Sequence, residues 1–284
     1  MADYLNFTSK NFAGIASTLD EGNVDPLYGS EYDFPRDLIG YGRESLDPQW
    51  PNGAKIAISF VINYEEGAER TVSNDDEQSE SHLWEQSNIG PRVGAYKFPV
   101  IAYAVGMALE KNPAVAKAFL DGGHEIASYA YRIRTCGLAL IHKIHEERSL
   151  PLLYESDYYD DDLPHWVDVP AEKSKDLKEA NGMLMIPYSY DCNDLKIHSP
   201  QGVGGPGAFE ENLKNAFDTL YEEGLAGKPK MMTIGLHCRI ISKSGRFPAL
   251  KRVVQYAASK PDVWMTTRKD IAVHFREKFP YSKK

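Results

Sequence analysis

The sequence has only three cysteines, and no two of them lie close together in the sequence. Cys136, Cys192 and Cys238 are far apart in a chain of 284 residues. A disulfide framework needs an even set of cysteines, and a structural zinc site needs closely spaced ones, so the sequence indicates neither. A reducing compartment suits this pattern, and we expect a cytoplasmic protein.

Long apolar runs and an excess of positive charge are missing as well. No apolar run approaches the ~20 residues that cross a bilayer, and the chain does not open with a basic segment followed by an apolar core. Lys and Arg number 32 against 41 Asp and Glu, which gives a net charge of −9. The sequence therefore argues against a membrane protein and against a nucleic-acid-binding protein.

Two parts are expected along the chain: an irregular N-terminal arm over residues 1–53 and a folded domain over residues 54–284. The arm is rich in Gly, Pro, Asp and Tyr and has no sustained period. It could pack on a neighbouring subunit as easily as on its own domain, so a homo-oligomer is compatible with the sequence. Two acidic stretches, 73–82 and 158–165, are predicted to be exposed loops.

Apolar and amphipathic segments alternate after the arm. The apolar runs predict strands at 55–63, 98–105, 124–129, 151–156, 183–188, 230–236 and 262–266. The amphipathic segments predict helices at 113–121, 208–224, 247–259 and 267–279. This alternation indicates an α/β fold with right-handed β-α-β units and a mainly parallel sheet, either open or closed as a barrel.

Two adjacent carboxylates, Glu65 and Glu66, directly follow the first predicted strand. In parallel α/β folds, side chains just past the strand ends face the bound ligand. Such a pair could hold a metal, act as a general base or bind a polar substrate. An acidic surface loop would explain the pair equally well.

Further polar side chains follow three other predicted strands. They are His237 and Arg239; Tyr188, Tyr190, Asp191, Asn193 and Asp194; and Tyr129, Tyr131 and Arg132. A carboxylate that takes a proton from water and a histidine that gives one to the leaving nitrogen can hydrolyse an amide-type bond. Arg or Tyr could then stabilise the oxyanion. A lone histidine at this place is also common as a hydrogen-bonded structural residue.

Several stretches along most of the chain resemble one family in collinear order. They are FPRDLIGYGR (34–43), PQWPNGAKIA (48–57), VINYEEGAER (61–70), YAVGMALEKNPAVAKAF (103–119), GGHEIAS (122–128), PLLYESDYYDDDLPHW (151–166), IPYSYDCND (186–194), PKMMTIGLHCRIISKSGRFPAL (229–250) and KPDVW (260–264). On these stretches the chain resembles the polysaccharide deacetylase superfamily (NodB homology, carbohydrate esterase 4), and within it the allantoinase-like branch.

The resemblance implies a distorted (β/α) barrel of the glycoside hydrolase/deacetylase type and hydrolysis of carbon–nitrogen bonds other than peptide bonds. The expected partner is a small molecule or a sugar, such as a cyclic ureide or an N-acetylated, chitin-like saccharide. On the matched motifs, Glu65 or Glu66 is the general base and His237 is the acid. The expected substrate-binding residues are Tyr188, Asp191, Asn193, Arg239 and Tyr129.

The chain departs from the family pattern in ways that bear on metal binding and on the barrel. Typical members hold a divalent metal with Asp-His-His, whereas Tyr129 stands here in place of a His, and a phenol stays protonated to about pH 10. We therefore expect no metal cofactor, the alternative being a weakly bound divalent cation. The stretches 87–97 and 133–150 are short, so about one β-α unit is expected to be missing. A catalytically degenerate member that acts as a binding or interaction protein is the alternative function.

Overall fold

A computed structural model describes residues 45–65, 71–72, 75–79, 101–104, 106–122, 126–128, 152–156, 158–169, 181–197 and 202–282. Leu46–Lys284 belong to one compact unit. Residues 1–44, which make up most of the predicted arm, lie outside the described residues, so the division at residues 53 and 54 stays a prediction. Trp50 nevertheless packs with the domain, because its side chain is buried and its indole N–H donates to the carbonyl of Lys230 at 2.9 Å.

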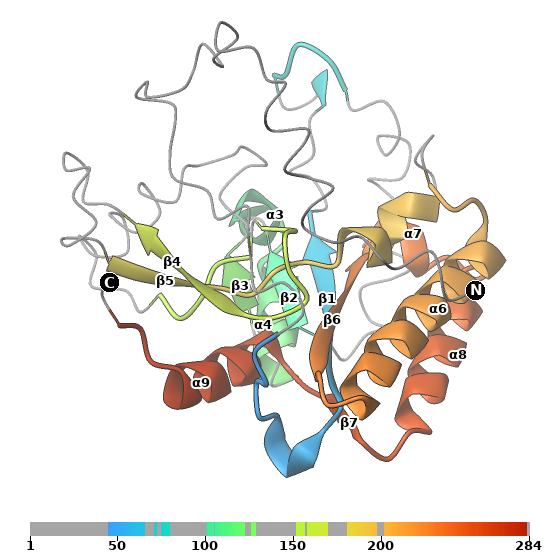
Figure 1. Cartoon of the computed structure of the whole chain (residues 1–284). Helices are drawn as coiled ribbons and strands as arrows, with labels where there is room; N and C mark the ends of the chain where they lie inside the picture. The colour runs from blue at the N-terminus through green and yellow to red at the C-terminus, as the bar shows by residue number, and fades with distance from the viewer. Residues whose placement is uncertain are drawn as a thin grey trace, which may run out of the picture. The chain divides into compact units, whose positions relative to one another are not determined.

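A parallel sheet forms the centre of the unit (Figure 1). Its strands are β1 (Ile56–Tyr64), β2 (Ile101–Ala104), β3 (Ile126–Ser128), β6 (Lys230–His237) and β7 (Val263–Met265). The order is β3-β2-β1-β6, β7 also pairs with β1, and every pair is parallel. The α/β class and the parallel sheet are confirmed. The pairings among the described strands do not form a closed ring, so the barrel stays an expectation.

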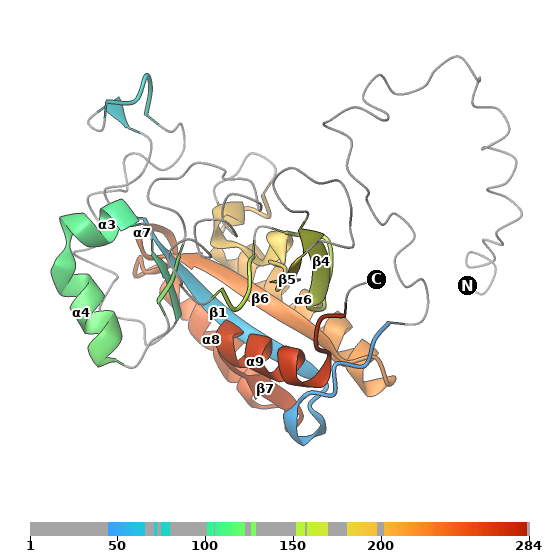
Figure 2. The same cartoon turned by 90° about the vertical axis from the view of Figure 1, so that its left-hand side faces the viewer.

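β1 is the strand to which the others attach. One of its edges pairs with β6 from Ile56 to Asn63, and Figure 2 shows these two strands side by side. The opposite edge is shared, because β7 pairs with Ile56–Ile58 and β2 pairs with Val61–Tyr64. Alternate residues of β1 enter cores on opposite faces of the sheet, as the unbroken apolar run predicted.

The helices cover this sheet and bury its two faces. They are α3 (Gly106–Lys111), α4 (Pro113–Asp121), α6 (Pro206–Leu225), α7 (Cys238–Ile241), α8 (Phe247–Ala258) and α9 (Arg268–Lys278). Phe209 and Leu213 of α6 pack with Ile58 in one core. Ile271 of α9 packs with Ala57 in the other. The four predicted helices are confirmed to within two residues at each end.

A second, smaller sheet corrects two sequence predictions. β4 (His165–Val169) and β5 (Asn181–Met185) pair with each other in antiparallel fashion, so the strand predicted at 183–188 begins earlier and does not join the parallel sheet. The described part of the strand predicted at 151–156, residues 152–156, forms no strand there and makes a bridge between Glu155 and Met185. The acidic stretch 158–165 is not wholly exposed, because Leu163 is buried in the core and anchors it there.

Within the described residues, no helix has both the length and the apolar character needed to cross a membrane.

The contact between α6 and the start of β1 yields a test of how tightly the sheet is packed. A Cβ added at Gly224 would overlap the backbone carbonyl of Lys55, whereas nothing lies within 4 Å of a Cβ at Gly207 in the first turn of the same helix. We expect Gly224→Ala to lower the free energy of unfolding by about 1–3 kcal/mol, as overpacking does. Gly207→Ala should leave it unchanged or slightly higher. Urea denaturation of both variants measures the difference, and equal values would contradict the packing.

Candidate active site

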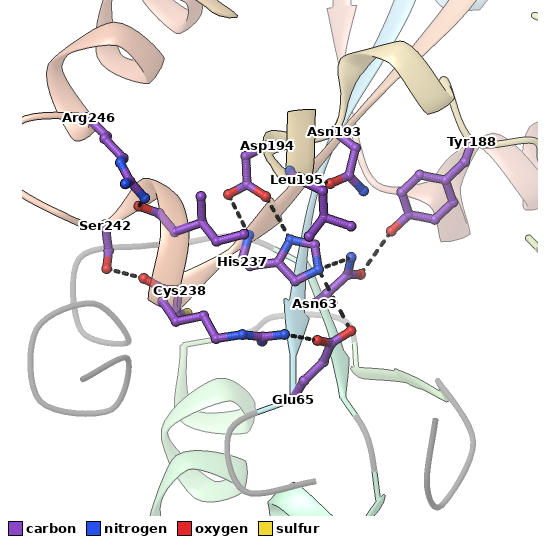
Figure 3. Close-up of polar contacts among 12 residues, drawn as sticks. Asn63, Glu65, Tyr188, Asn193, Asp194, Leu195, His237, Cys238, Ser242 and Arg246 are labelled. Atoms are coloured by element: carbon purple, nitrogen blue, oxygen red, sulfur yellow. Dashed lines mark hydrogen bonds and ion pairs between the residues drawn. The ribbon is translucent and has the colours of Figure 1, made fainter. Parts of the chain in front are cut away.

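The carboxyl ends of β1 and β6 bring the predicted catalytic side chains together. The strand register places Asn63 directly opposite His237. Glu65 follows β1 immediately, and one of its carboxylate oxygens lies 3.7 Å from Nε2 of His237 (Figure 3). The expectation that Glu65 and His237 meet at the same end of the sheet is confirmed. Their catalytic roles stay predictions.

Asp194 holds the imidazole from the side opposite Glu65. It belongs to the short 3-10 helix η8 (Asp194–Ile197). One carboxylate oxygen of Asp194 accepts the backbone N–H of His237 at 2.8 Å, and the other lies 2.7 Å from Nδ1. Because a carboxylate can only accept at this place, Nδ1 carries a hydrogen. Both the position and the tautomer of His237 are therefore fixed from one side chain.

Arg239 binds the other oxygen of Glu65. Its guanidinium Nη2 donates to Oε2 of Glu65 at 2.5 Å. Glu65, Asp194, His237 and Arg239 are each exposed by 4% or less. These four residues, here called the charge cluster, place two carboxylates beside two groups that can be cationic in the protein interior.

The charge cluster sets the protonation of its members. Burial lowers the pKa of His237, but the charges of Asp194 and Glu65 outweigh this effect and raise the pKa to about 9. Burial raises the pKa of Glu65, but His237 and Arg239 outweigh it and lower the pKa to about 2. At neutral pH, His237 is therefore an imidazolium ion and Glu65 is a carboxylate.

The predicted substrate-binding residues differ in how close they lie to His237. The hydroxyl of Tyr188 donates to Oδ1 of Asn63 at 3.1 Å, and the amide of Asn63 in turn contacts the imidazole of His237. Asn193 lies against the backbone of β6, where a Cβ at Gly235 would contact its amide. Asp191 contacts groups other than His237: its carboxylate accepts from the thiol of Cys192, and its backbone carbonyl accepts from the side-chain amide of Asn212 on α6.

Two predicted site residues, Glu66 and Tyr129, lie outside the described residues. Arg239 is bound to Glu65, and its expected contact with substrate stays a prediction. Two contacts of His237 were missed. In the sequence, Asp194 is only one of several polar residues after a predicted strand, and the predicted site does not include Asn63. The signal for Asn63 was a polar residue at the end of an otherwise apolar buried strand.

The described donors do not fit a divalent metal. No group of three or more His, Cys, Asp or Glu side chains within the described ranges is arranged to hold one. The oxygens of Glu65 already face Arg239 and His237, and both oxygens of Asp194 face His237. The two negative charges of the cluster are balanced by two positive ones, so a cation would meet no excess of negative charge.

The raised pKa of His237 predicts how stability depends on pH. The folded-state value of about 9 lies above the ordinary 6.5. The charge of His237 therefore stabilises the fold fully below pH 6.5, and this contribution is lost as the pH rises through 9. At about 1.4 kcal/mol per pKa unit, the loss is on the order of 3 kcal/mol.

Urea denaturation of the native protein and of His237→Gln, measured from pH 6 upward, isolates this contribution. The free energy of unfolding should fall with rising pH more steeply in the native protein than in the variant. Equal slopes would show that folding does not raise the pKa of His237.

Comparisons with curated proteins and solved structures identify the family of this chain. No family model matches the sequence. A Schizosaccharomyces pombe protein assigned as a polysaccharide deacetylase is 33% identical over 87% of this chain and 98% of its own length. The 314 aligned positions exceed the 284 residues of this chain, so the relative has segments with no counterpart here.

Solved structures give the same family. The crystal structure of a protein assigned as a polysaccharide deacetylase in Pseudomonas aeruginosa PAO1 is 36% identical, with a TM-score of 0.75 over 88% of this chain and 100% of its own. PuuE allantoinase is also 36% identical, with a TM-score of 0.74 over the same shares. A Mycobacterium smegmatis structure at 16% identity has a TM-score of 0.63 over 83% of this chain and 95% of its own and supports the fold alone. The chain belongs to the polysaccharide deacetylase family.

Proposed function

We propose that this protein hydrolyses a carbon–nitrogen bond other than a peptide bond, with His237 as the acid. The observation that carries the proposal is the placement of the His237 imidazole between two carboxylates at the carboxyl end of the parallel sheet. Relatives named as polysaccharide deacetylases and an allantoinase support the same class of reaction. An N-acetylated sugar and a cyclic ureide are the two substrate classes that follow.

The reaction needs one base and one acid. A carboxylate takes a proton from water as the water oxygen bonds to the carbonyl carbon, and a tetrahedral intermediate forms. The carbon–nitrogen bond then breaks, and the nitrogen leaves with the proton from Nε2 of His237. Asp194 supports this step, because its carboxylate keeps Nδ1 protonated and stabilises the imidazolium before the transfer.

Of the two candidate bases, we favour Glu66. A carboxylate whose pKa is lowered to about 2 has little affinity for a proton, and Glu65 is also bound to Arg239. Glu65 then compensates the charge of His237 and positions it. Glu66, which follows it in the sequence, takes the role of base. No step of this proposal uses a metal ion.

Exposed aromatic rings beside Tyr188 support a small ring-shaped substrate. Tyr159 and Tyr190 are 59% and 60% exposed. Their ring centroids lie 5.4 Å apart, and the ring of Tyr159 lies 6.2 Å from that of Tyr188. Rings of this kind can stack on the face of a sugar or on a planar ureide. We propose that these two tyrosines contact the part of the substrate that does not react.

Two observations favour the alternative, a family member that binds ligands without turnover. The four residues of the charge cluster are all buried and are bonded to one another. The longer relative shows that this chain lacks segments that its family can carry. In this alternative the cluster stabilises the fold and does not act on a substrate.

Variants of the acid and of both carboxylates test the proposed chemistry. His237→Gln should lower kcat by ~10²–10⁴-fold, the usual effect of losing general acid–base catalysis. Glu66→Gln should cost about as much, whereas Glu65→Gln should act mainly through stability and the pKa of His237. His165→Gln, at a partly exposed histidine of β4, is the control. Hydrolysis of allantoin, other cyclic ureides and acetylated chito-oligosaccharides is measured with and without chelator.

The outcomes separate the two functions. Turnover that survives in His237→Gln would refute the role of His237. An inactive native protein whose melting temperature still rises with one of these compounds would support the binding alternative.

The aromatic contacts can be tested separately from the chemistry. Tyr190→Ala should raise KM several-fold and leave kcat nearly unchanged, because the ring is proposed to contact only the unreactive part of the substrate. Leu120→Ala, which removes an exposed apolar side chain from α4, is the control. A fall in kcat at unchanged KM would place Tyr190 nearer the reacting bond.

A further inference from the structure

Asn63 lies between His237 and Tyr188, and Figure 3 shows its amide facing both. Its Nδ2 is 3.2 Å from Nε2 of His237, and its Oδ1 accepts the hydroxyl of Tyr188 at 3.1 Å. We propose that the Asn63 amide turns over whenever Nε2 of His237 gains or loses a proton, with the Tyr188 hydroxyl as its partner in both orientations. The catalytic consequence of this motion rests on the proposed function.

The argument begins with the side of the ring that cannot change. Nδ1 faces a carboxylate oxygen of Asp194 at 2.7 Å, so it keeps its hydrogen in both charge states. Nε2 is therefore the atom that changes. In the neutral ring it has a lone pair, which accepts the Asn63 N–H in the orientation described. In the imidazolium it carries a hydrogen, and that orientation would place two donors against each other at 3.2 Å.

Turning the amide by 180° removes this conflict. Oδ1 of Asn63 then accepts from Nε2–H, and Nδ2 donates to the oxygen of Tyr188. A tyrosine hydroxyl can both donate and accept, so it pairs with either end of the amide. Asn63 and Tyr188 are 3% and 7% exposed. A polar group left unpaired at such a place is costly, which favours the orientation that pairs every group.

Tyr188 is held well enough for the amide alone to move. The guanidinium of Arg268 lies 4.6 Å from the centroid of its ring. Nη2 of Arg268 also donates to the backbone carbonyls of Ile186 and Pro187, which directly precede Tyr188. The backbone N–H of Tyr188 donates to the carbonyl of Tyr158 at 2.9 Å.

Of the charged groups around the ring, Glu65 stabilises the proton on Nε2, but the Asn63 amide is the nearer neighbour of that atom. Asp194 faces Nδ1, and Glu65 lies 3.7 Å from Nε2, farther than Asn63. Arg239 acts through Glu65, and the charge of Arg246 is felt by Asp194. Asn63 is thus a positioning residue for the proton on Nε2, and Tyr188 is positioned to support it in both states.

Nuclear magnetic resonance on the complete protein tests the motion without any substrate. The side-chain amide nitrogen of Asn63 and Nε2 of His237 are followed as the pH is raised through the pKa of about 9. We expect both resonances to change with the same midpoint, because the amide exchanges one partner for the other. An Asn63 amide resonance that stays constant while Nε2 titrates would overturn the proposal. This readout remains valid even if the protein hydrolyses nothing.

Kinetics of Tyr188→Phe test the role of the hydroxyl. This variant keeps the ring that packs against Arg268 and removes only the partner of Asn63. We expect kcat to fall about tenfold, the effect of one lost hydrogen bond, while KM changes less than about twofold. Tyr256→Phe, which removes a hydroxyl bonded to Asp218 on the helical face, is the control and should keep native kinetics. Unchanged kcat in Tyr188→Phe, or a loss carried by KM alone, would contradict the assigned role.

Discussion

The parallel register of β1 on β6 is the constraint on which the candidate site depends. It places Asn63 opposite His237, and the residues that follow each strand then meet at one edge of the sheet. A slip of one residue would turn every side chain of β1 to the other face and would separate these groups. The register is held by burial on both faces, because alternate residues of β1 enter two different cores. Hydrophobic packing of β1 thus also brings the polar groups of the candidate site together.

Charge balance is the second constraint, and it acts on the segments that lie outside the strands. Glu65 follows β1, Asp194 belongs to η8, and Arg239 lies in α7. Removing charged groups from water is costly, and only close pairing offsets that cost. The three segments are therefore joined by groups that are stable in the interior only together. Loss of one member would leave a buried charge without its partner. This would lower the stability of the fold more than replacing the whole cluster by apolar residues would.

The sequence was sufficient to predict the alternation of strands and helices. It also predicted that Glu65 and His237 meet at the carboxyl end of the sheet. Apolar runs and amphipathic periods are local properties, so they identified β1, β6 and α8 directly. The antiparallel pair of β4 and β5 was not predicted, because short strands with mixed composition do not reveal their partners. The contacts within the site were also beyond reach. Asn63 and His237 are 174 residues apart, and strand ends indicate a neighbourhood but not which groups pair.

The shared edge of β1 has a consequence for the synthesis of the chain. β1 leaves the ribosome before its partner β6, which follows about 170 residues later, and β7, which fills part of the opposite edge, comes later still. While those residues are synthesised, the apolar strand β1 lacks the neighbours that complete it. Contacts so distant in sequence slow folding, and unpaired apolar strands invite association with other chains. The segment from Lys230 onward supplies β6 and β7 and so completes the centre of the sheet. A nascent chain that lacks this segment exposes unpaired apolar strands and is a substrate for chaperones.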